Sequence, residues 1–292
     1  MTSTAPAGAR TDGLTDANFE RFREYFYAQT GIQFGSTKRY FVDKRVEACI
    51  QASGEDGFAA WFAKVRMGTR PELIEQMVNR FTVNETYFLR EDYQFDDLLA
   101  SVLPEIAAER ARNGEPVRIL SMPCSTGEEP YSIALKLLTE WPLINDVDVQ
   151  IHAADIDSNA LEHARQGTYG ERSLHRVSPA LRRKFFTAVD DNHWQISEDI
   201  RSAVDFRHVN VCDSRQMLGL VDFDVIFCRN MLIYFDELSS RRAAENLYGA
   251  LRPGGYLFLG HSESMSRISP IFTPRRLPAG LAYQRPRSGA TS

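Results

Sequence analysis

The sequence has no apolar run as long as a membrane helix, which needs about 18 consecutive apolar residues. Residues 1–13 are polar and lack the apolar core of a secretory signal; we expect them, and residues 285–292, to be disordered. The four cysteines are scattered without metal-ligand spacing, so we expect reduced thiols in the core. These absences favour a cytoplasmic protein that has no metal site and does not insert into a membrane.

The chain also lacks an excess of basic residues, because 34 Lys and Arg face 39 Asp and Glu for a net charge of −5. Dedicated nucleic-acid-binding proteins usually carry a basic surface, so no nucleic-acid partner is expected. The glycine fingerprint G-x-G-x-x-G of dinucleotide-binding folds is missing as well. The pattern of strands and helices is therefore the only feature of the sequence that supports an NAD-dependent oxidoreductase.

Two patterns divide the chain. Between Thr15 and Phe81, apolar residues recur at steps of three and four, and glycines separate several short helices. Further on, short apolar runs alternate with amphipathic stretches, as in a parallel sheet covered by helices. The predicted strands are 117–120, 147–153, 206–209, 223–227, 256–259 and 281–284, the last at the sheet edge, and the longer predicted helices are 92–112, 131–141, 158–166 and 237–251.

We predict an α/β fold, a doubly wound Rossmann-like domain preceded by a small all-α domain. The predicted boundaries are 14–82 for the helical domain, 83–115 for a linker and connecting helix, and 116–286 for the α/β domain. A stretch at about 170–204 breaks the alternation with a basic helix and a possible hairpin. We predict that it is a small β-containing insertion.

The turn at 121–131 follows the first predicted strand of the sheet and opens a helix, with Pro130 expected at the first helical position. Ligands of open α/β sheets bind beyond the carboxyl ends of the strands. Glu128 and Glu129 in this turn would repel a pyrophosphate but attract a sulfonium or an ammonium group. The turn therefore favours S-adenosylmethionine over NAD. Alternatively, the two glutamates only stabilise the helix dipole.

Three other segments carry polar residues at informative places. Asp155 ends the second strand, where nucleotide-binding domains place a carboxylate for ribose hydroxyls, although it could instead cap the next helix. The segment 228–236 follows a buried strand at the edge of the sheet where chemistry would occur, although Tyr234 alone would be a core residue. The segment 82–90 interleaves polar and aromatic residues and, in isolation, is only a capped helix start.

Taken together, these segments resemble the CheR family of chemotaxis receptor methyltransferases, which methylate glutamate side chains of bacterial chemoreceptors with S-adenosylmethionine. The resemblance runs from about Phe19 to Tyr283. Its motifs are Asn84-x-Thr86-x-x-x-Arg90, Ser125-Thr126-Gly127-Glu128-Glu129-Pro130-Tyr131-Ser132, Asp155-Ile156-Asp157, Cys228-Arg229-Asn230 with Ile233-Tyr234-Phe235, and Gly260-His261-Ser262-Glu263. The last motif contains His261, which is either close to the active site or a core histidine.

The resemblance implies a set of site residues. Arg90 and Tyr234 match residues at the methyl-transfer centre. The positions that match cofactor-binding residues are Asn84, Thr86, Arg90, Glu128, Asp155, Asn210, Val211, Arg229 and Asn230. The basic residues that match a receptor-binding face are Lys38, Arg39, Lys44 and Arg45, which could equally form a solvated helix face.

The resemblance also implies glutamate methyl esters and S-adenosylhomocysteine as products, the cytoplasmic domain of chemoreceptors as partner, and a monomer. The predicted hairpin at 187–196 is short and lacks the glycine-bearing loop of family members that bind a receptor pentapeptide. We therefore expect a pentapeptide-independent enzyme. The alternative is a non-catalytic signalling module that binds S-adenosylmethionine.

Overall fold

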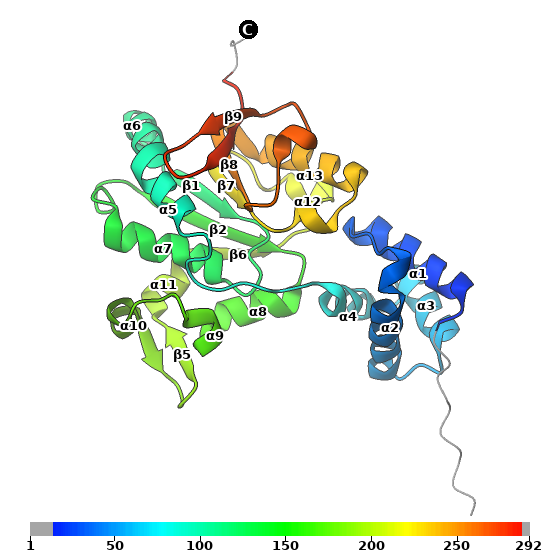
Figure 1. The fold of residues 1–292 in the computed structure, drawn as a ribbon. Helices are drawn as coiled ribbons and strands as arrows, with labels where there is room; N and C mark the ends of the chain where they lie inside the picture. Colours follow the sequence, from blue (N-terminus) through cyan, green and yellow to red (C-terminus); the bar gives the residue numbers. More distant parts are fainter. Residues whose placement is uncertain (1–13, 288–292) are drawn as a thin grey trace, which may run out of the picture. The chain divides into compact units, whose positions relative to one another are not determined.

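The structure, a computed structural model, describes residues 14–287. The disorder expected for 1–13, and for 288–292 at the other end, lies outside the described residues. The chain divides between Thr82 and Val83 into two compact units (Figure 1).

The first unit is helical. It contains α1 (Asp16–Thr30), the 3₁₀ turn η1 (Ser36–Lys38), α2 (Arg39–Ser53), α3 (Phe58–Met67) and α4 (Pro71–Phe81). The Thr15 side chain caps α1 by accepting a hydrogen bond from the Asn18 N–H, and Gly31 ends this helix at a φ of 77°. The residues with helical spacing bury an aromatic core in which the Phe22 and Phe81 ring centroids lie 5.1 Å apart.

The second unit is built on a seven-stranded sheet, and the predicted α/β class is confirmed. Five parallel strands lie in the order β6 (Val204–His208), β2 (Val149–Asp155), β1 (Val117–Ser121), β7 (Phe223–Cys228) and β8 (Leu251–Leu259). The antiparallel strands β10 (Leu281–Gln284) and β9 (Thr273–Arg276) complete it. The chain order reverses between β1 and β7, which is the switch point where ligands of such sheets bind.

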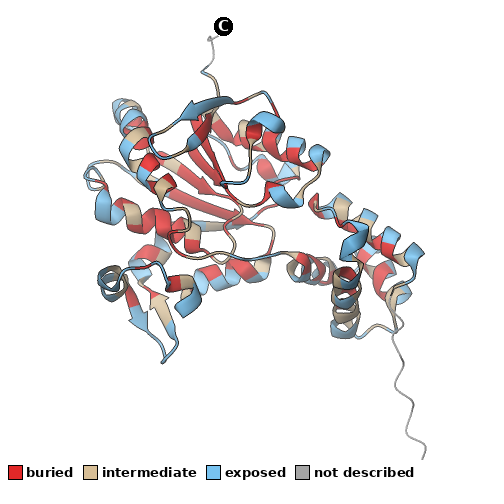
Figure 2. Ribbon diagram, viewed as in Figure 1, coloured by how far each residue is buried: buried red, intermediate tan, exposed pale blue. Residues whose placement is uncertain are grey.

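Helices cover both faces of this sheet (Figure 2). Successive residues of a strand point to opposite faces, so they pack into two different hydrophobic cores. Ile119 of β1 packs into the core with α5 (Tyr93–Asp97), α6 (Leu103–Asn113), α7 (Glu128–Glu140) and α8 (Ser158–Gln166). The next residue, Leu120, packs into the core with α12 (Ser214–Met217) and α13 (Glu237–Ala250). Buried on both faces, the strands read as continuous apolar runs, which explains why the sequence predicted them.

The predicted strands 147–153, 206–209 and 256–259 are shifted or extended by two to five residues at one end or both, and three further elements differ in kind or position. The strand 281–284 is not at the edge, because the unpredicted β9, whose residues are all exposed, lies outside it. A π-helical segment, η2 (Leu98–Val102), interrupts the predicted helix 92–112. The next helix begins at Glu128, so Pro130 is its third residue rather than its first; no bond is lost, because the first four N–H groups of a helix have no partner within it.

The β-containing insertion has its own antiparallel sheet in the order β3 (Thr168–Gly170), β5 (His193–Ile196) and β4 (Phe186–Ala188). The short helices α9 (Glu171–Leu174), α10 (Pro179–Phe185) and α11 (Glu198–Ser202) accompany it. Arg182 of α10 stacks over the Trp194 ring at 3.6 Å from its centroid, which fixes the helix on the small sheet.

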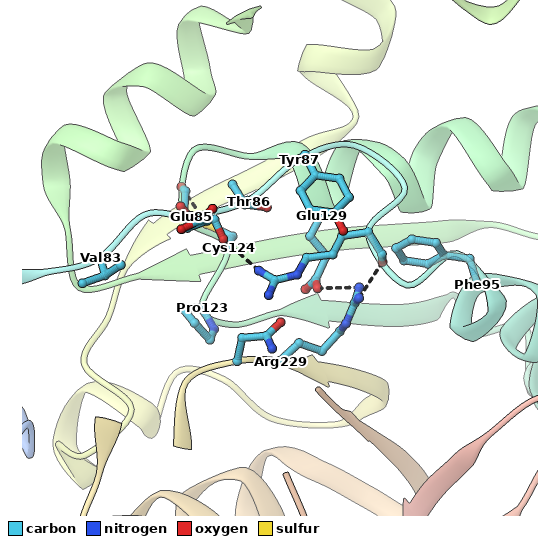
Figure 3. A pocket seen from close by; sticks show the side chains of 12 residues that line it. Val83, Glu85, Thr86, Tyr87, Phe95, Pro123, Cys124, Glu129 and Arg229 are labelled. Atoms are coloured by element: carbon cyan, nitrogen blue, oxygen red, sulfur yellow. Dashed lines mark hydrogen bonds and ion pairs between the residues drawn. The ribbon is translucent and has the colours of Figure 1, made fainter. Parts of the chain in front are cut away.

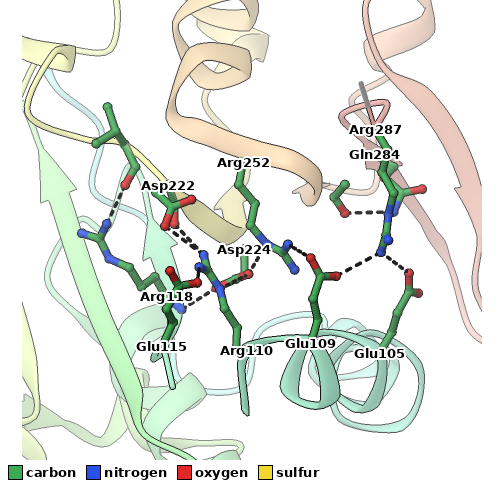
Figure 4. Close-up of polar contacts among 12 residues, drawn as sticks. Glu105, Glu109, Arg110, Glu115, Arg118, Asp222, Asp224, Arg252, Gln284 and Arg287 are labelled. Carbon is green, nitrogen blue, oxygen red and sulfur yellow. Dashed lines mark hydrogen bonds and ion pairs between the residues drawn. The ribbon is translucent and has the colours of Figure 1, made fainter. Parts of the chain in front are cut away.

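A buried ion network joins α6 to the starts of β7 and β8 (Figure 4). The Asp224 carboxylate, fully buried, accepts hydrogen bonds from Arg110 at 2.9 and 3.1 Å and also pairs with Arg252. Burial by itself lowers the pKa of Arg110, but its hydrogen bonds to Asp224 and Glu115 outweigh this and raise it. The network holds the sheet at the end opposite to the carboxyl ends of its parallel strands.

The first residues of the expected disordered tail are in fact bound to the α/β unit. The Arg285 N–H donates to the Gly255 carbonyl at 2.9 Å, and Arg287 pairs with Glu105 and Glu109 of α6 at 3.2 Å. The disorder predicted for 285–287 is therefore wrong. Arginine side chains anchor this segment where composition alone indicated a free end.

Candidate functional site

A cavity lies beyond the carboxyl ends of β1 and β7, at the switch point of the sheet (Figure 3). Every lining residue belongs to the α/β unit. They are Val83, Glu85, Thr86, Tyr87, Arg90, Phe95, Pro123, Cys124, Ser125, Glu129, Arg229 and Asn230.

The turn after β1 forms one wall, and its backbone requires glycine at one position. Gly127 has a φ of 95°, and a Cβ there would lie 2.8 Å from the Ala164 Cβ and 3.0 Å from the Tyr169 hydroxyl. That hydroxyl donates to the Thr126 carbonyl at 2.8 Å. The turn is therefore packed against β3 and α8, which fixes the position at which α7 begins.

The two adjacent glutamates of this turn point to different surroundings. Glu128 is buried and accepts hydrogen bonds from the Thr126 and Ser173 hydroxyls at 2.6 and 2.9 Å, and burial raises its pKa. Glu129 lines the cavity, where it accepts from the Ser121 hydroxyl at 2.7 Å. Thus the carboxylate at the cavity is that of Glu129, whereas the resemblance had implied Glu128.

Arg229 follows β7 and neutralises the Glu129 carboxylate, with 3.0 Å between its Nη1 and Oε2 (Figure 3). Burial raises the pKa of Glu129, and the charge of Arg229 acts against this rise. The buried Nε of Arg229 has no hydrogen-bond partner among residues 14–287. A ligand acceptor that reached this N–H would remove the cost of leaving it unpaired.

Glu263, from the Gly260-His261-Ser262-Glu263 motif, holds the loop after β7 in place. Its carboxylate accepts from the N–H groups of Asn230 at 2.8 Å and Leu232 at 2.7 Å, and from that of Gly260 at 2.8 Å. Asn230 has a φ of 58°, an unfavourable backbone conformation that these bonds maintain.

The segment 83–90 forms the opposite wall. The Leu89 N–H donates to the Ser132 hydroxyl at 2.9 Å, and Arg90 donates to the Glu85 carbonyl at 2.8 Å. Leu89 and Glu91, on either side of Arg90, have φ values of 58° and 53°. Strained residues flanking a side chain at a cavity are typical of functional sites.

Glu91 connects this wall to the loops after β7 and β8. Its carboxylate lies 2.9 Å from His261 Nδ1 and 3.4 Å from Arg229 Nη2. Burial alone raises the pKa of Glu91, but the hydrogen bond with His261 and the charge of Arg229 outweigh it, so the net pKa is lowered. His261 is 67% exposed, so the alternative of a core histidine is wrong.

Asp155, at the end of β2, is buried beside the turn after β1. Its carboxylate accepts from the Ser125 N–H at 2.7 Å and the Asp157 N–H at 2.9 Å, and burial raises its pKa to about 6. Asp157 caps α8, and its other oxygen accepts from the Asn84 amide at 2.6 Å. Asn84 and Asp155 therefore meet at Ser125, although neither is among the cavity-lining residues.

The remaining candidates lie at different distances from the cavity. Asn210 and Val211 are buried after β6, and their neighbour Val209 is bonded to the Asp155 carbonyl at 2.9 Å. Tyr234, in the 3₁₀ turn η3 (Leu232–Tyr234), is 40% exposed rather than in the core. Burial raises the pKa of Tyr234, and the charge of Arg90 acts against this rise.

The four basic candidates belong to the helical unit. Arg39 is committed to that unit's own packing, because it pairs with Asp16 and Asp43 at 2.7 and 2.8 Å. Arg45 lies 3.7 Å from the centroid of the Phe41 ring. Lys38 and Lys44 are exposed and form no ion pair within residues 14–287.

Sequence reasoning missed several residues of the site. Glu91 and Phe95 belong to none of the motifs. Tyr87 lies in the segment 82–90 but was not singled out there. All four cysteines are buried, as predicted. Cys124 lines the cavity, but burial raises the pKa of its thiol well above the usual value, which makes it a poor nucleophile.

No group of three or more His, Cys, Asp or Glu side chains among residues 14–287 is arranged to hold a metal ion. Across the same residues, every helix is too short or too polar to span a bilayer. The donor set suits an organic zwitterion instead. Glu129 offers a carboxylate to a cation, Arg229 offers an unpaired N–H to an anion, and Phe95 offers an aromatic surface. This chemistry fits S-adenosylmethionine.

Two family models match the chain. "CheR methyltransferase, SAM binding domain" matches residues 84–280, and "CheR methyltransferase, all-alpha domain" matches residues 17–82. Chemotaxis protein methyltransferase 2 of Vibrio cholerae is 46% identical over 276 residues, which cover 94% of this chain and 95% of that protein. Chemotaxis protein methyltransferase 1 of Pseudomonas aeruginosa is 35% identical over 274 residues, which cover 92% of this chain and 98% of that protein.

Proposed function

Because the chain belongs to the CheR methyltransferase family, we propose that it transfers the methyl group of S-adenosylmethionine to glutamate carboxylates of chemoreceptors, with S-adenosylhomocysteine as the second product. The membership predicted from the motifs is confirmed, and S-adenosylmethionine is the cofactor of the domain. The observation that carries the proposal is the cavity at the β1–β7 switch point, where Glu129, Arg229 and Arg90 come together.

The cofactor, when bound, supplies an electrophilic methyl group on a sulfonium centre. A glutamate side chain has a pKa near 4.3, so at neutral pH it is already the nucleophilic carboxylate and needs no general base. The protein has to bind and orient this carboxylate and to exclude water, since water stabilises the separated charges of the ground state.

Arg90 and Tyr234 are the residues that we propose for this task. Arg90 would hold the carboxylate oxygen that does not attack, because a bidentate pair would weaken the nucleophile. Tyr234 would donate a hydrogen bond from its hydroxyl. The Glu85 carbonyl already accepts one N–H of Arg90, which sets the direction of the guanidinium.

Cofactor binding, on this proposal, uses Asn84, Thr86, Asp155, Asn210, Val211, Arg229 and Asn230 in addition to Arg90. At the α7 start we propose Glu129 in place of Glu128, because only Glu129 lines the cavity. Glu128 would act indirectly, by joining the turn to Ser173 of α9.

The role of the two proposed catalytic residues is testable with Arg90→Ala and Tyr234→Phe. Both variants should bind S-adenosylhomocysteine in calorimetry, Arg90→Ala more weakly, and both should methylate a receptor fragment far more slowly than the wild type. Tyr248→Phe, on α13 and in none of the motifs quoted above, is the matched control. Wild-type turnover by both variants would contradict the assignment.

We further propose that the protein acts in the cytoplasm as a monomer on the cytoplasmic domain of receptors, with Lys38, Arg39, Lys44 and Arg45 on its receptor-binding face. The connection from β4 to β5 spans only residues 189–192 and contains no glycine. It therefore supports pentapeptide independence. A micromolar or tighter affinity for a receptor C-terminal pentapeptide would contradict this.

A non-catalytic signalling module is not favoured, because relatives that match nearly the whole chain are named methyltransferases. The expected acidic turn, together with the missing glycine fingerprint, also argues against an NAD-dependent oxidoreductase. Titration with NAD should give no heat.

A further inference from the structure

Two arginines, Arg90 and Arg176, lie against the Tyr87 ring at the cavity, and a third, Arg172, pairs with the cavity-lining Glu85; we call the three the arginine rim. The Cζ atoms of Arg90 and Arg176 lie 5.8 and 6.0 Å from the centroid of this ring. Arg172 reaches the same segment through Glu85, at 2.8 Å between Nη2 and Oε1. Arg172 and Arg176 follow β3 in the insertion and lie outside the family motifs quoted above.

The rim is held to the cavity wall by defined contacts. The Phe88 N–H donates to the Ser173 carbonyl at 3.0 Å, and the Ser173 hydroxyl donates to Glu128 at the start of α7. His175 packs against Tyr87 with 4.7 Å between ring centroids. The insertion therefore places Arg172 and Arg176 next to Glu85 and Tyr87, which line the cavity.

The rim has more positive charge than its surroundings neutralise. The ion pair of Arg172 with Glu85 is the only one that the three arginines form within residues 14–287. Arg176 is exposed and has no carboxylate partner there. The nearby Glu91 carboxylate is already used by His261 and Arg229. In a chain of net charge −5, this local cationic excess at the cavity mouth indicates an anionic partner.

We propose that Arg176 of the arginine rim binds a second carboxylate of the methyl acceptor, from an acidic residue near the glutamate that is modified. The inference rests on the proposed function, in which Arg90 holds the reacting carboxylate. The planar guanidinium of Arg176 suits a carboxylate, which it can bind through two N–H groups. Its distance from the ring places its Cζ within about 12 Å of that of Arg90.

A span of that length limits the acceptor. It corresponds to about two turns of a helix, at 5.4 Å each, or to three or four residues of extended chain. The rim therefore selects acceptors that carry acidic residues on one face within two helical turns of the target. A target glutamate without acidic neighbours would bind the same cavity but would lack the contact with Arg176.

The test measures methyl transfer from radiolabelled S-adenosylmethionine to a purified cytoplasmic fragment of a chemoreceptor from the same organism. Arg176→Ala should raise KM about threefold, and Arg176→Glu about tenfold or more, because an exposed charge pair contributes up to about 1 kcal/mol and reversal adds repulsion. Arg176→Lys should stay near the wild type. The kcat and the affinity for S-adenosylhomocysteine should not change.

Arg183→Ala and Arg183→Glu are the matched controls, since Arg183 is an exposed arginine of the same insertion outside the rim. Both should leave KM unchanged. Replacing the acidic neighbours of the target glutamate by glutamine in the fragment should raise the wild-type KM and remove the difference between the wild type and Arg176→Ala.

Equal KM values for Arg176→Glu and Arg183→Glu would overturn the inference, as would weaker S-adenosylhomocysteine binding by Arg176→Glu, which indicates a structural role. Inhibition of the wild type by a short RNA but not by an oligo-glutamate peptide would also overturn it. If the wild type does not methylate the fragment at all, the proposed function fails instead, so the two failures are distinguishable.

Discussion

Glu128 and Glu129 provide the sharpest test of the cavity, because they are adjacent in sequence and differ in surroundings. The perturbation is the same in both variants, Glu128→Gln and Glu129→Gln, which remove one negative charge and keep the shape of the side chain. Only Glu129 lines the cavity and pairs with Arg229. We expect cofactor affinity to depend on Glu129 far more than on Glu128.

The magnitudes follow from the contacts. In Glu129→Gln the amide oxygen can still accept from Ser121, but the carboxylate charge that pairs with Arg229 at the cavity is lost. Hydrogen bonds to charged groups contribute about 1.5–3 kcal/mol, which corresponds to an affinity loss of about 10- to 150-fold. Glu128 accepts from two hydroxyls, which can reorient toward an amide, so Glu128→Gln should weaken binding by less than about threefold.

The assay is calorimetric titration of each variant with S-adenosylhomocysteine, and thermal melting of the unliganded proteins provides the control for folding. The reasoning is refuted if Glu128→Gln loses as much affinity as Glu129→Gln while both melt like the wild type. That result would indicate that Glu128, the residue implied by the family motif, contacts the cofactor.

Three further predictions concern pH and stability. Since the pKa of Asp155 is raised to about 6 and ribose hydroxyls require the ionised carboxylate, S-adenosylhomocysteine should bind about tenfold more weakly at pH 5 than at pH 7; Asp155→Asn, titrated likewise, should abolish this dependence. Gly127→Ala, which places a Cβ 2.8 Å from a neighbouring side chain, should lower the free energy of unfolding in urea by about 2–5 kcal/mol. The same change at Gly114, with no atom within 4 Å, should cost about 1–2 kcal/mol. Asp224→Asn should cost up to about 3–5 kcal/mol, because it removes the fully buried carboxylate that Arg110 and Arg252 share and leaves them only their more exposed partners. The matched control is Asp222→Asn, which removes a half-exposed carboxylate that also pairs with Arg110. If Asp222→Asn lowers the free energy of unfolding in urea as much as Asp224→Asn does, the importance assigned to the buried carboxylate is contradicted.

The sheet was predictable because its central strands are buried on both faces and appear as continuous apolar runs. The exposed β9 was not, since Thr273–Arg276 has no apolar residue to pack against a face. For the same reason the sequence predicted that 281–284 lies at the edge. Secondary structure was thus readable where burial determines composition and unreadable where it does not.

The site was predictable only as separate segments. The choice between Glu128 and Glu129 could not be made, because neighbouring helical residues point about 100° apart and the pattern does not fix which one faces the ligand. Glu91 carried no signal, since its partners Arg229 and His261 lie far away in sequence. Folding brings these side chains together, and no local spacing contains that information.

Methyl transfer from radiolabelled S-adenosylmethionine to receptor-containing membranes tests the central claim most directly. A carboxyl ester is hydrolysed by base, so the account predicts label on the receptor that mild alkali releases as methanol. Label that survives alkali, or a receptor that remains unlabelled although the protein binds S-adenosylhomocysteine, would contradict it.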